Sequence, residues 1–198
     1  MTNWQEKWQN SDTPWDLNAP HPLLVKAQQH LSKTGLWPNS GRAYVPACGR
    51  CHDGAFLAEL GWSVLGGDIV AEAIASAQSI YSDCPNLKLK QIDHFSLAKA
   101  NLGFFELVFD RAASCAFAAE QQREFIVKSF EALKPDGLYI SVAFQQIAEG
   151  VPGPPFALLP ESFEQIAELG TFVLLEDHPK ATPLDKIITE RIIVAKKR

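Results

Sequence analysis

The chain lacks the long apolar run and the basic cluster that mark membrane and nucleic-acid-binding proteins. No stretch approaches the roughly 20 apolar residues that cross a bilayer, and Met1 to Asp16 is polar and Trp-rich, unlike a secretory signal. The net charge is -5, from 18 Lys and Arg against 23 Asp and Glu, and basic residues cluster only at Lys196, Lys197 and Arg198. We therefore expect a cytoplasmic protein that neither enters a membrane nor binds nucleic acid.

Cysteine is scarce, but Cys48, Cys51 and His52 spell C-x-x-C-H, a pattern typical of c-type haem attachment. Haem attachment requires export to an oxidising compartment, and the absence of an export signal disfavours it. Cys84 and Cys115 have no C-x-x-C partner, so a tetrahedral zinc set is incomplete and no metal is expected. A reactive dithiol stays open, because Cys51 begins an expected helix. We favour two small side chains packed in a tight turn.

From residue 43 onward, short apolar runs alternate with longer amphipathic segments, which is typical of βα units around a mostly parallel sheet. The predicted strands are Ala43–Ala47, Ser63–Gly67, Leu87–Ile92, Leu107–Asp110, Leu138–Phe144, Thr171–Glu176 and Ile187–Ala195. The predicted helices are Pro22–Lys33, His52–Leu60, Val70–Tyr81 and Glu120–Leu133, the last ended by a Lys134–Gly137 turn. The last two strands are joined by too few residues for a helical crossover, so we expect them to run antiparallel.

The turn after the first predicted strand is the candidate ligand site, because ligands of doubly wound sheets lie beyond the carboxyl ends of the strands. Gly49 lets the backbone approach a ligand there, and Asp68 follows nineteen residues later, where an acid accepts hydrogen bonds from ribose. The chain lacks both G-x-G-x-x-G and G-x-x-x-x-G-K-[ST], which disfavours NAD, FAD and ATP. A nucleoside without phosphates, such as S-adenosylmethionine, is favoured. The alternative is a turn glycine beside a helix-capping aspartate.

Several motifs together resemble one family. They are W-x-x-x-W-x-x-x-x-x-x-W, whose last Trp lies in T-P-W-D, then V-P-A-C-G-R-C-H-D, G-G-D-I, Asp93-His94-Phe95, F-D-R, L-K-P-D-G-L and G-P-P-F. From Trp4 to about Arg191 the chain resembles the thiopurine S-methyltransferase family, and T-P-W-D is closer to its halide and thiol methyltransferase branch. The resemblance implies a single α/β domain with the Rossmann-like, seven-stranded class I methyltransferase fold. Its sheet is mostly parallel with an antiparallel last strand, residues 1–40 form an N-terminal helical lid segment and residues 41–198 form the core.

The resemblance also implies roles for individual residues toward S-adenosylmethionine. Ala47 and Gly49 would contact its methionine part, Asp68 its ribose, and Asp93 with His94 its adenine. The lid residues Trp4, Trp8 and Trp15 would close over the site, because indole faces attract a sulfonium cation. An apolar strap over a sheet edge is the alternative for these tryptophans.

Two further positions are implied at the end of the fourth strand. Asp110 would lie at the cofactor and Arg111 at the acceptor, where a permanently charged guanidinium can hold an anion. Phe156 would line the acceptor pocket. The alternative for Asp110 and Arg111 is a structural ion pair. Cys51 stands where many members of that family carry Gly or another small residue, and His52 precedes the matching acid Asp53, so this turn departs from the family pattern.

The expected function is methyl transfer from S-adenosylmethionine to a small soft nucleophile, such as a thiol, a sulfide, a thiopurine or a halide. The residues do not specify which acceptor is used. Two alternatives are a sensor that binds S-adenosylmethionine without turnover, suggested by the Cys51-His52 departure, and a nicotinamide-dependent enzyme on a related sheet. We expect a monomer, because no interface stripe is evident.

Overall fold

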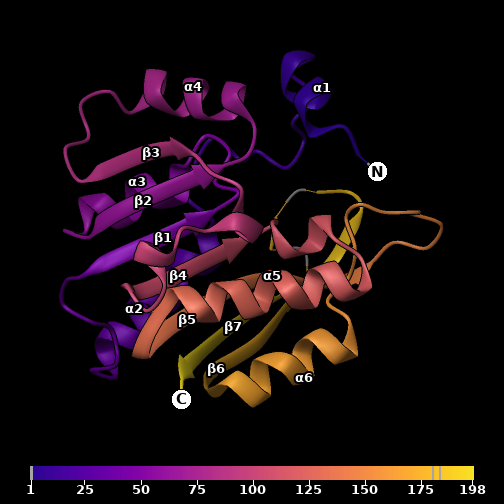
Figure 1. Ribbon diagram of the computed structural model, residues 1–198. Coiled ribbons are helices and arrows are strands. Elements are labelled where there is room, and N and C mark those ends of the chain that lie inside the picture. The colour runs from indigo at the N-terminus through magenta and orange to yellow at the C-terminus, as the bar shows by residue number, and fades with distance from the viewer. Residues whose placement is uncertain (1, 180, 183) are drawn as a thin grey trace.

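The computed structural model describes residues 2–179, 181–182 and 184–198. It contains a twisted seven-stranded sheet with helices on both faces (Figure 1). The strands are β1 (Arg42–Pro46), β2 (Ser63–Asp68), β3 (Leu87–Gln91), β4 (Phe105–Arg111), β5 (Leu133–Ile147), β6 (Gly170–Pro179) and β7 (Ile187–Lys197). Their order is β3-β2-β1-β4-β5-β7-β6. β7 runs antiparallel to β5 and β6, whereas the pairs among β1 to β5 are parallel. The predicted α/β fold with its antiparallel last strand is confirmed.

The helices divide between the two faces of the sheet. They are α1 (Trp4–Gln9), α2 (Pro22–Lys33), α3 (His52–Glu59), α4 (Ala71–Ile80), α5 (Ala119–Ala132) and α6 (Pro160–Leu169). Apolar side chains of α2 and α3 share one core cluster with β1, β4 and β5, and those of α5 and α6 share a second on the opposite face. In the described part of the chain, no helix combines the length and apolarity needed to span a membrane.

The helix α2 shows how the pattern of apolar residues builds the core. Its bounds match the prediction, with Pro22 in the first turn and the His21 side chain accepting a hydrogen bond from the Leu23 N–H. Leu24 and Leu31 recur at helical spacing and are fully buried against the sheet. The prediction grouped this helix with the lid segment, whereas the apolar face of α2 packs into the main core.

Two departures from the predicted elements have local causes. β5 begins at Leu133, and not after the predicted Lys134–Gly137 turn, because Leu133 already pairs with Phe105 ahead of a register shift. The residues of that turn form the irregular start of the strand. The helix α6 was not predicted, although Pro160 in its first turn and the spacing of Phe163 and Ile166 indicate a helix.

Candidate functional site

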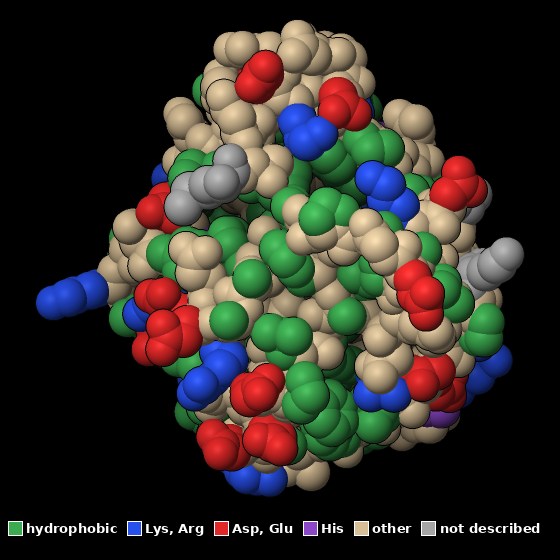
Figure 2. Space-filling view, turned by 90° about the vertical axis from the view of Figure 1, so that its right-hand side faces the viewer, with side chains coloured by type: hydrophobic (Ala, Val, Ile, Leu, Met, Phe, Trp, Pro, Cys, Tyr) green, Lys and Arg blue, Asp and Glu red, His purple; other side chains and the backbone are tan. Residues whose placement is uncertain are grey.

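A cavity of about 520 Å³ lies at the carboxyl ends of β1, β2, β4 and β5. Its walls come from the segment ahead of α2, the β1–α3 turn, the ends of these strands and the loop that holds Pro154 and Pro155. Figure 2 shows hydrophobic side chains gathered across the centre of this face, with charged side chains around them. A mostly apolar cavity of this size at this end of the sheet is typical of a small-molecule site in α/β proteins.

The β1–α3 turn and Asp68 face each other in the cavity wall, as predicted. Gly49 has a left-handed φ of 54°, and its N–H donates to Asp68 Oδ2 at 2.9 Å. The Val70 N–H donates to Oδ1 at 2.9 Å. Burial raises the pKa of Asp68 despite these hydrogen bonds. Each carboxylate oxygen keeps a second lone pair, so Asp68 can cap the chain and also accept hydrogen bonds from a ligand.

The two cysteines of the turn are packed inside it. Cys51 is 1% exposed, and its Sγ leaves no room for a side chain at Gly54 or Gly66, where a Cβ would lie 2.4 and 2.6 Å away. A hydrogen bond with Cys51, together with burial, holds the pKa of the Cys48 thiol well above its ordinary value. These contacts agree with small side chains packed in a tight turn. The described residues contain no cluster of three His, Cys, Asp or Glu placed to hold a metal ion.

Three lid tryptophans line the cavity. The ring centres of Trp4 and Trp15 lie 5.5 Å apart with planes at 81°, and those of Trp8 and Trp15 lie 6.4 Å apart at 67°. The helix α1 that carries two of them lies beside α4 (Figure 1), where Gln9 Nε2 donates to Glu72 Oε1 at 3.2 Å. The segment thus covers the cavity and holds edge-to-face indole pairs over it.

Arg111 ends β4 and lines the cavity, and two of its nitrogens have no hydrogen-bond partner in the described part of the chain. Its Nε and Nη2 are buried, and neither makes a hydrogen bond to any residue that the structure describes. The preceding Asp110 is fully buried and accepts hydrogen bonds from Tyr139 Oη at 2.7 Å, Ser141 Oγ at 3.2 Å and the Ser114 N–H at 3.1 Å. Because successive strand residues point to opposite faces, these two side chains diverge and form no ion pair with each other.

Four predicted site residues lie outside the cavity wall. Besides Asp110, these are His94, Asp93 and Phe156. The ring centres of His94 and Phe125 lie 4.2 Å apart, and His94 Nε2 donates a hydrogen bond to the Phe125 carbonyl oxygen at 3.0 Å. Burial lowers the pKa of His94.

The Asp93 carboxylate caps a short 3-10 turn, accepting from the Phe95 N–H at 3.0 Å and from Ser96 Oγ at 2.9 Å. The Phe156 ring covers Gly153, whose Cβ would lie 2.3 Å from it. The ligand contacts implied for these four residues stay predictions. Ala47 does lie in the wall, as predicted.

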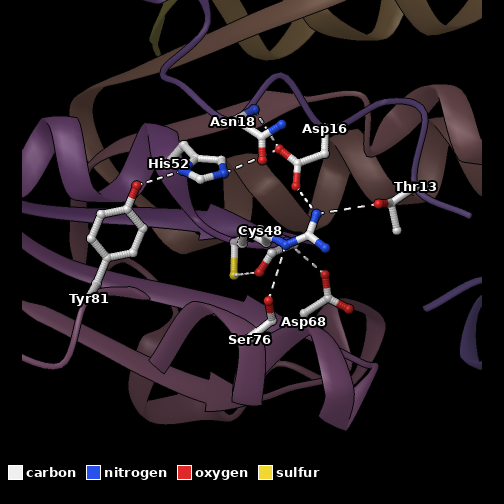
Figure 3. Close-up of polar contacts among 10 residues, drawn as sticks. Thr13, Asp16, Asn18, Cys48, His52, Asp68, Ser76 and Tyr81 are labelled. Carbon is white, nitrogen blue, oxygen red and sulfur yellow. Dashed lines mark hydrogen bonds and ion pairs between the residues drawn. The ribbon is translucent and has the colours of Figure 1, made fainter. Parts of the chain in front are cut away.

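Three polar residues that lie together in the cavity wall were not assigned from the sequence. They are Arg50 in the β1–α3 turn, Asp16 ahead of α2 and His52 at the start of α3, and all three line the cavity. Arg50 and His52 each lie within ion-pair distance of Asp16, and Figure 3 shows Asp16 beside His52. Asp16 lies in T-P-W-D and Arg50 in V-P-A-C-G-R-C-H-D. The two residues are 34 positions apart, so neither motif indicates that their side chains meet. The signal in the sequence that could have indicated this group is the arginine that directly follows Gly49.

Comparisons with known proteins identify relatives of this chain. The family description "Thiopurine S-methyltransferase (TPMT)" matches residues 1–181. Thiocyanate methyltransferase 1 of Arabidopsis thaliana is 33% identical over 191 residues, which cover 92% of this chain and 79% of that protein. Thiopurine S-methyltransferase of Shewanella woodyi is 31% identical over 173 residues, which cover 78% of this chain and 76% of that protein.

Solved structures share the fold. The N-methyltransferase NodS from Bradyrhizobium japonicum WM9, in complex with S-adenosyl-L-homocysteine, superposes with a TM-score of 0.74 at 17% identity, covering 99% of each chain. A Burkholderia thailandensis N1-methyltransferase superposes with a TM-score of 0.75 at 16% identity, covering 97% of this chain and 84% of that one. The family match extends over most of the chain, and the cavity lies at the carboxyl ends of the strands. The chain therefore belongs to the thiopurine S-methyltransferase family of S-adenosylmethionine-dependent methyltransferases.

Proposed function

We propose that the protein methylates a small sulfur acceptor that binds as an anion, a thiolate or the hydrosulfide ion, and that Arg111 holds it. The observation that carries this proposal is that Arg111 lies in the cavity wall, with its Nε and Nη2 buried and without a hydrogen-bond partner among the described residues. A buried donor without a partner is costly, so a bound anion that accepts from it is strongly favoured. The relatives include thiocyanate, thiol and thiopurine methyltransferases, which agrees with a soft sulfur acceptor.

The residues around the cavity fit S-adenosylmethionine. When bound, this cofactor supplies a methyl group on a positively charged sulfur. Asp68 has lone pairs left for ribose hydroxyls, and Gly49 brings backbone to the cavity surface without a side chain. The indole faces of Trp4 and Trp8 attract cations and exclude water.

The chain's own contribution is to bind and orient the acceptor. Arg111 stays charged at every working pH, so it favours the anionic form of a thiol whose free pKa is about 8.5. Phe117 and Phe144 in the same wall exclude water, which leaves the anion poorly solvated. No general base is needed once the acceptor binds as an anion, and orientation supplies most of the rate enhancement.

An acceptor panel tests the proposal. Formation of S-adenosylhomocysteine is measured with an alkanethiol, hydrosulfide, thiocyanate, iodide and a thiopurine, for the wild type, Arg111→Lys and Arg111→Met. We expect Arg111→Met to lower kcat/KM for the sulfur anions about 10- to 150-fold, because a hydrogen bond to a charged group contributes about 1.5 to 3 kcal/mol. Affinity for S-adenosylhomocysteine stays within twofold. Unchanged kcat/KM rejects the role of Arg111, and no turnover with any acceptor supports the sensor alternative.

We further infer that the protein acts as a monomer in the cytoplasm. The four cysteines of the chain are free thiols, as is usual in a reducing compartment. Light scattering after gel filtration tests the monomer, with a mass of 21.9 kDa expected.

A further inference from the structure

The side chain of Arg50 joins the β1–α3 turn to three separate elements. Its Nε donates to Ser76 Oγ on α4 at 3.1 Å, and its Nη1 donates to Thr13 Oγ1 at 3.3 Å and to Asp16 Oδ2. The guanidinium carbon lies 5.1 Å from the ring centre of Trp8 on α1, within the range of a cation–π contact. A planar fork of donors suits this role, because several acceptors can be held at once in fixed directions.

Asp16 is held from two sides (Figure 3). Its side chain is only 7% exposed, and His52 Nε2 lies 3.2 Å from its Oδ1 on the side away from Arg50. Burial favours the neutral acid, but the hydrogen bonds from the Asn18 N–H and from Arg50 outweigh it and lower the pKa of Asp16. His52 is fixed in turn by Tyr81, whose Oη lies 2.6 Å from Nδ1. Asp16 is thus a buried carboxylate with a cation beside it.

These contacts determine where the lid rings stand. Trp15 directly precedes Asp16, and Trp8 lies against Arg50. Gly49 directly precedes Arg50 in the sequence, and its N–H donates a hydrogen bond to Asp68 Oδ2. One short turn therefore links the carboxylate expected to hold the ribose to the indoles expected to cover the sulfonium.

We infer that Asp16, Arg50 and His52 form a latch that positions Trp8 and Trp15 over the cofactor and sets how fast the demethylated cofactor leaves. Arg50 and Asp16 are positioning residues, since they act through the tryptophans. Removing one member of a buried, hydrogen-bonded charge pair leaves the other unpaired, and such a loss mainly raises dissociation rates. The inference rests on S-adenosylmethionine as the cofactor and is independent of which acceptor is methylated.

Release of S-adenosylhomocysteine, followed by stopped-flow tryptophan fluorescence, tests the latch without any acceptor. Asp16→Asn and Arg50→Met are each expected to raise the dissociation rate about tenfold or more, with the association rate within threefold of the wild type. The double variant should add little to Arg50→Met, because that change already removes the contact with Asp16. Trypsin should also cleave after Lys7 faster in Asp16→Asn than in the wild type when the product is bound.

Asp12→Asn is the matched control. Asp12 pairs with Lys7 at 2.6 Å within the same lid, but both side chains are substantially exposed and neither contacts the turn through this pair. Its dissociation rate should stay within twofold of the wild type. Dissociation unchanged in folded Asp16→Asn and Arg50→Met overturns the inference, as does an equal effect of Asp12→Asn. If both latch variants fail to fold, Arg50→Lys, which keeps the charge but loses the fork, must release the product faster.

Discussion

Replacement of Asp68 separates its two roles, holding the turn and accepting hydrogen bonds from ribose. The carboxylate accepts two backbone N–H bonds of 2.9 Å and is 7% exposed. Asp68→Ala removes both acceptors and leaves the N–H groups of Gly49 and Val70 without a partner. We expect cofactor affinity to fall by about 1 to 3 kcal/mol through lost bonds to a charged group, which is about 5- to 150-fold in Kd.

Asp68→Asn provides the comparison, because it keeps the shape and one acceptor oxygen. Isothermal titration of S-adenosylhomocysteine gives the Kd of both variants, and urea unfolding gives their stability. We expect the Asn variant to retain most of the stability but to bind more weakly than the wild type. If Asp68→Ala binds the product with wild-type affinity, the ribose assignment is wrong.

Three further predictions concern stability. Burial lowers the pKa of His94 below its unfolded value near 6.5. The stability that neutral His94 contributes is therefore present at pH 7.5 and is lost as the pH falls through the lowered pKa. Between pH 7.5 and 5.5, urea unfolding should show a larger loss of unfolding free energy for the wild type than for His94→Gln. Burial would raise the pKa of Glu106, but hydrogen bonds, first from Lys134, hold it below its ordinary value near 4.5. Glu106→Gln should therefore lower Tm at pH 7, and calorimetry should show this difference shrinking as the pH falls through the lowered pKa. Ile140 is fully buried, and Ile140→Ala should reduce the free energy of unfolding by about 2 to 5 kcal/mol in urea; a loss below 1 kcal/mol would contradict the packing described for this strand.

Much of the fold could be read from local patterns. The apolar spacing of α2 sets both its bounds and its buried face, since a helix repeats every 3.6 residues whatever lies around it. The short apolar runs likewise mark the strands. Gly49 and Asp68 could be paired in advance, because neighbouring parallel strands bring their carboxyl ends to one edge of a sheet.

Other features depend on contacts between distant parts of the chain. Local periodicity says nothing about which lid residue meets Arg50, and the contact with Asp16 exists only because the chain ahead of α2 folds back over the β1–α3 turn. In the same way, the pleat of β4 buries the Asp110 carboxylate among hydroxyl groups of β5 and leaves Arg111 at the cavity with two nitrogens unpartnered among the described residues. Strand order and packing supply these neighbours, and the neighbours decide whether a charged side chain is structural or available to a ligand.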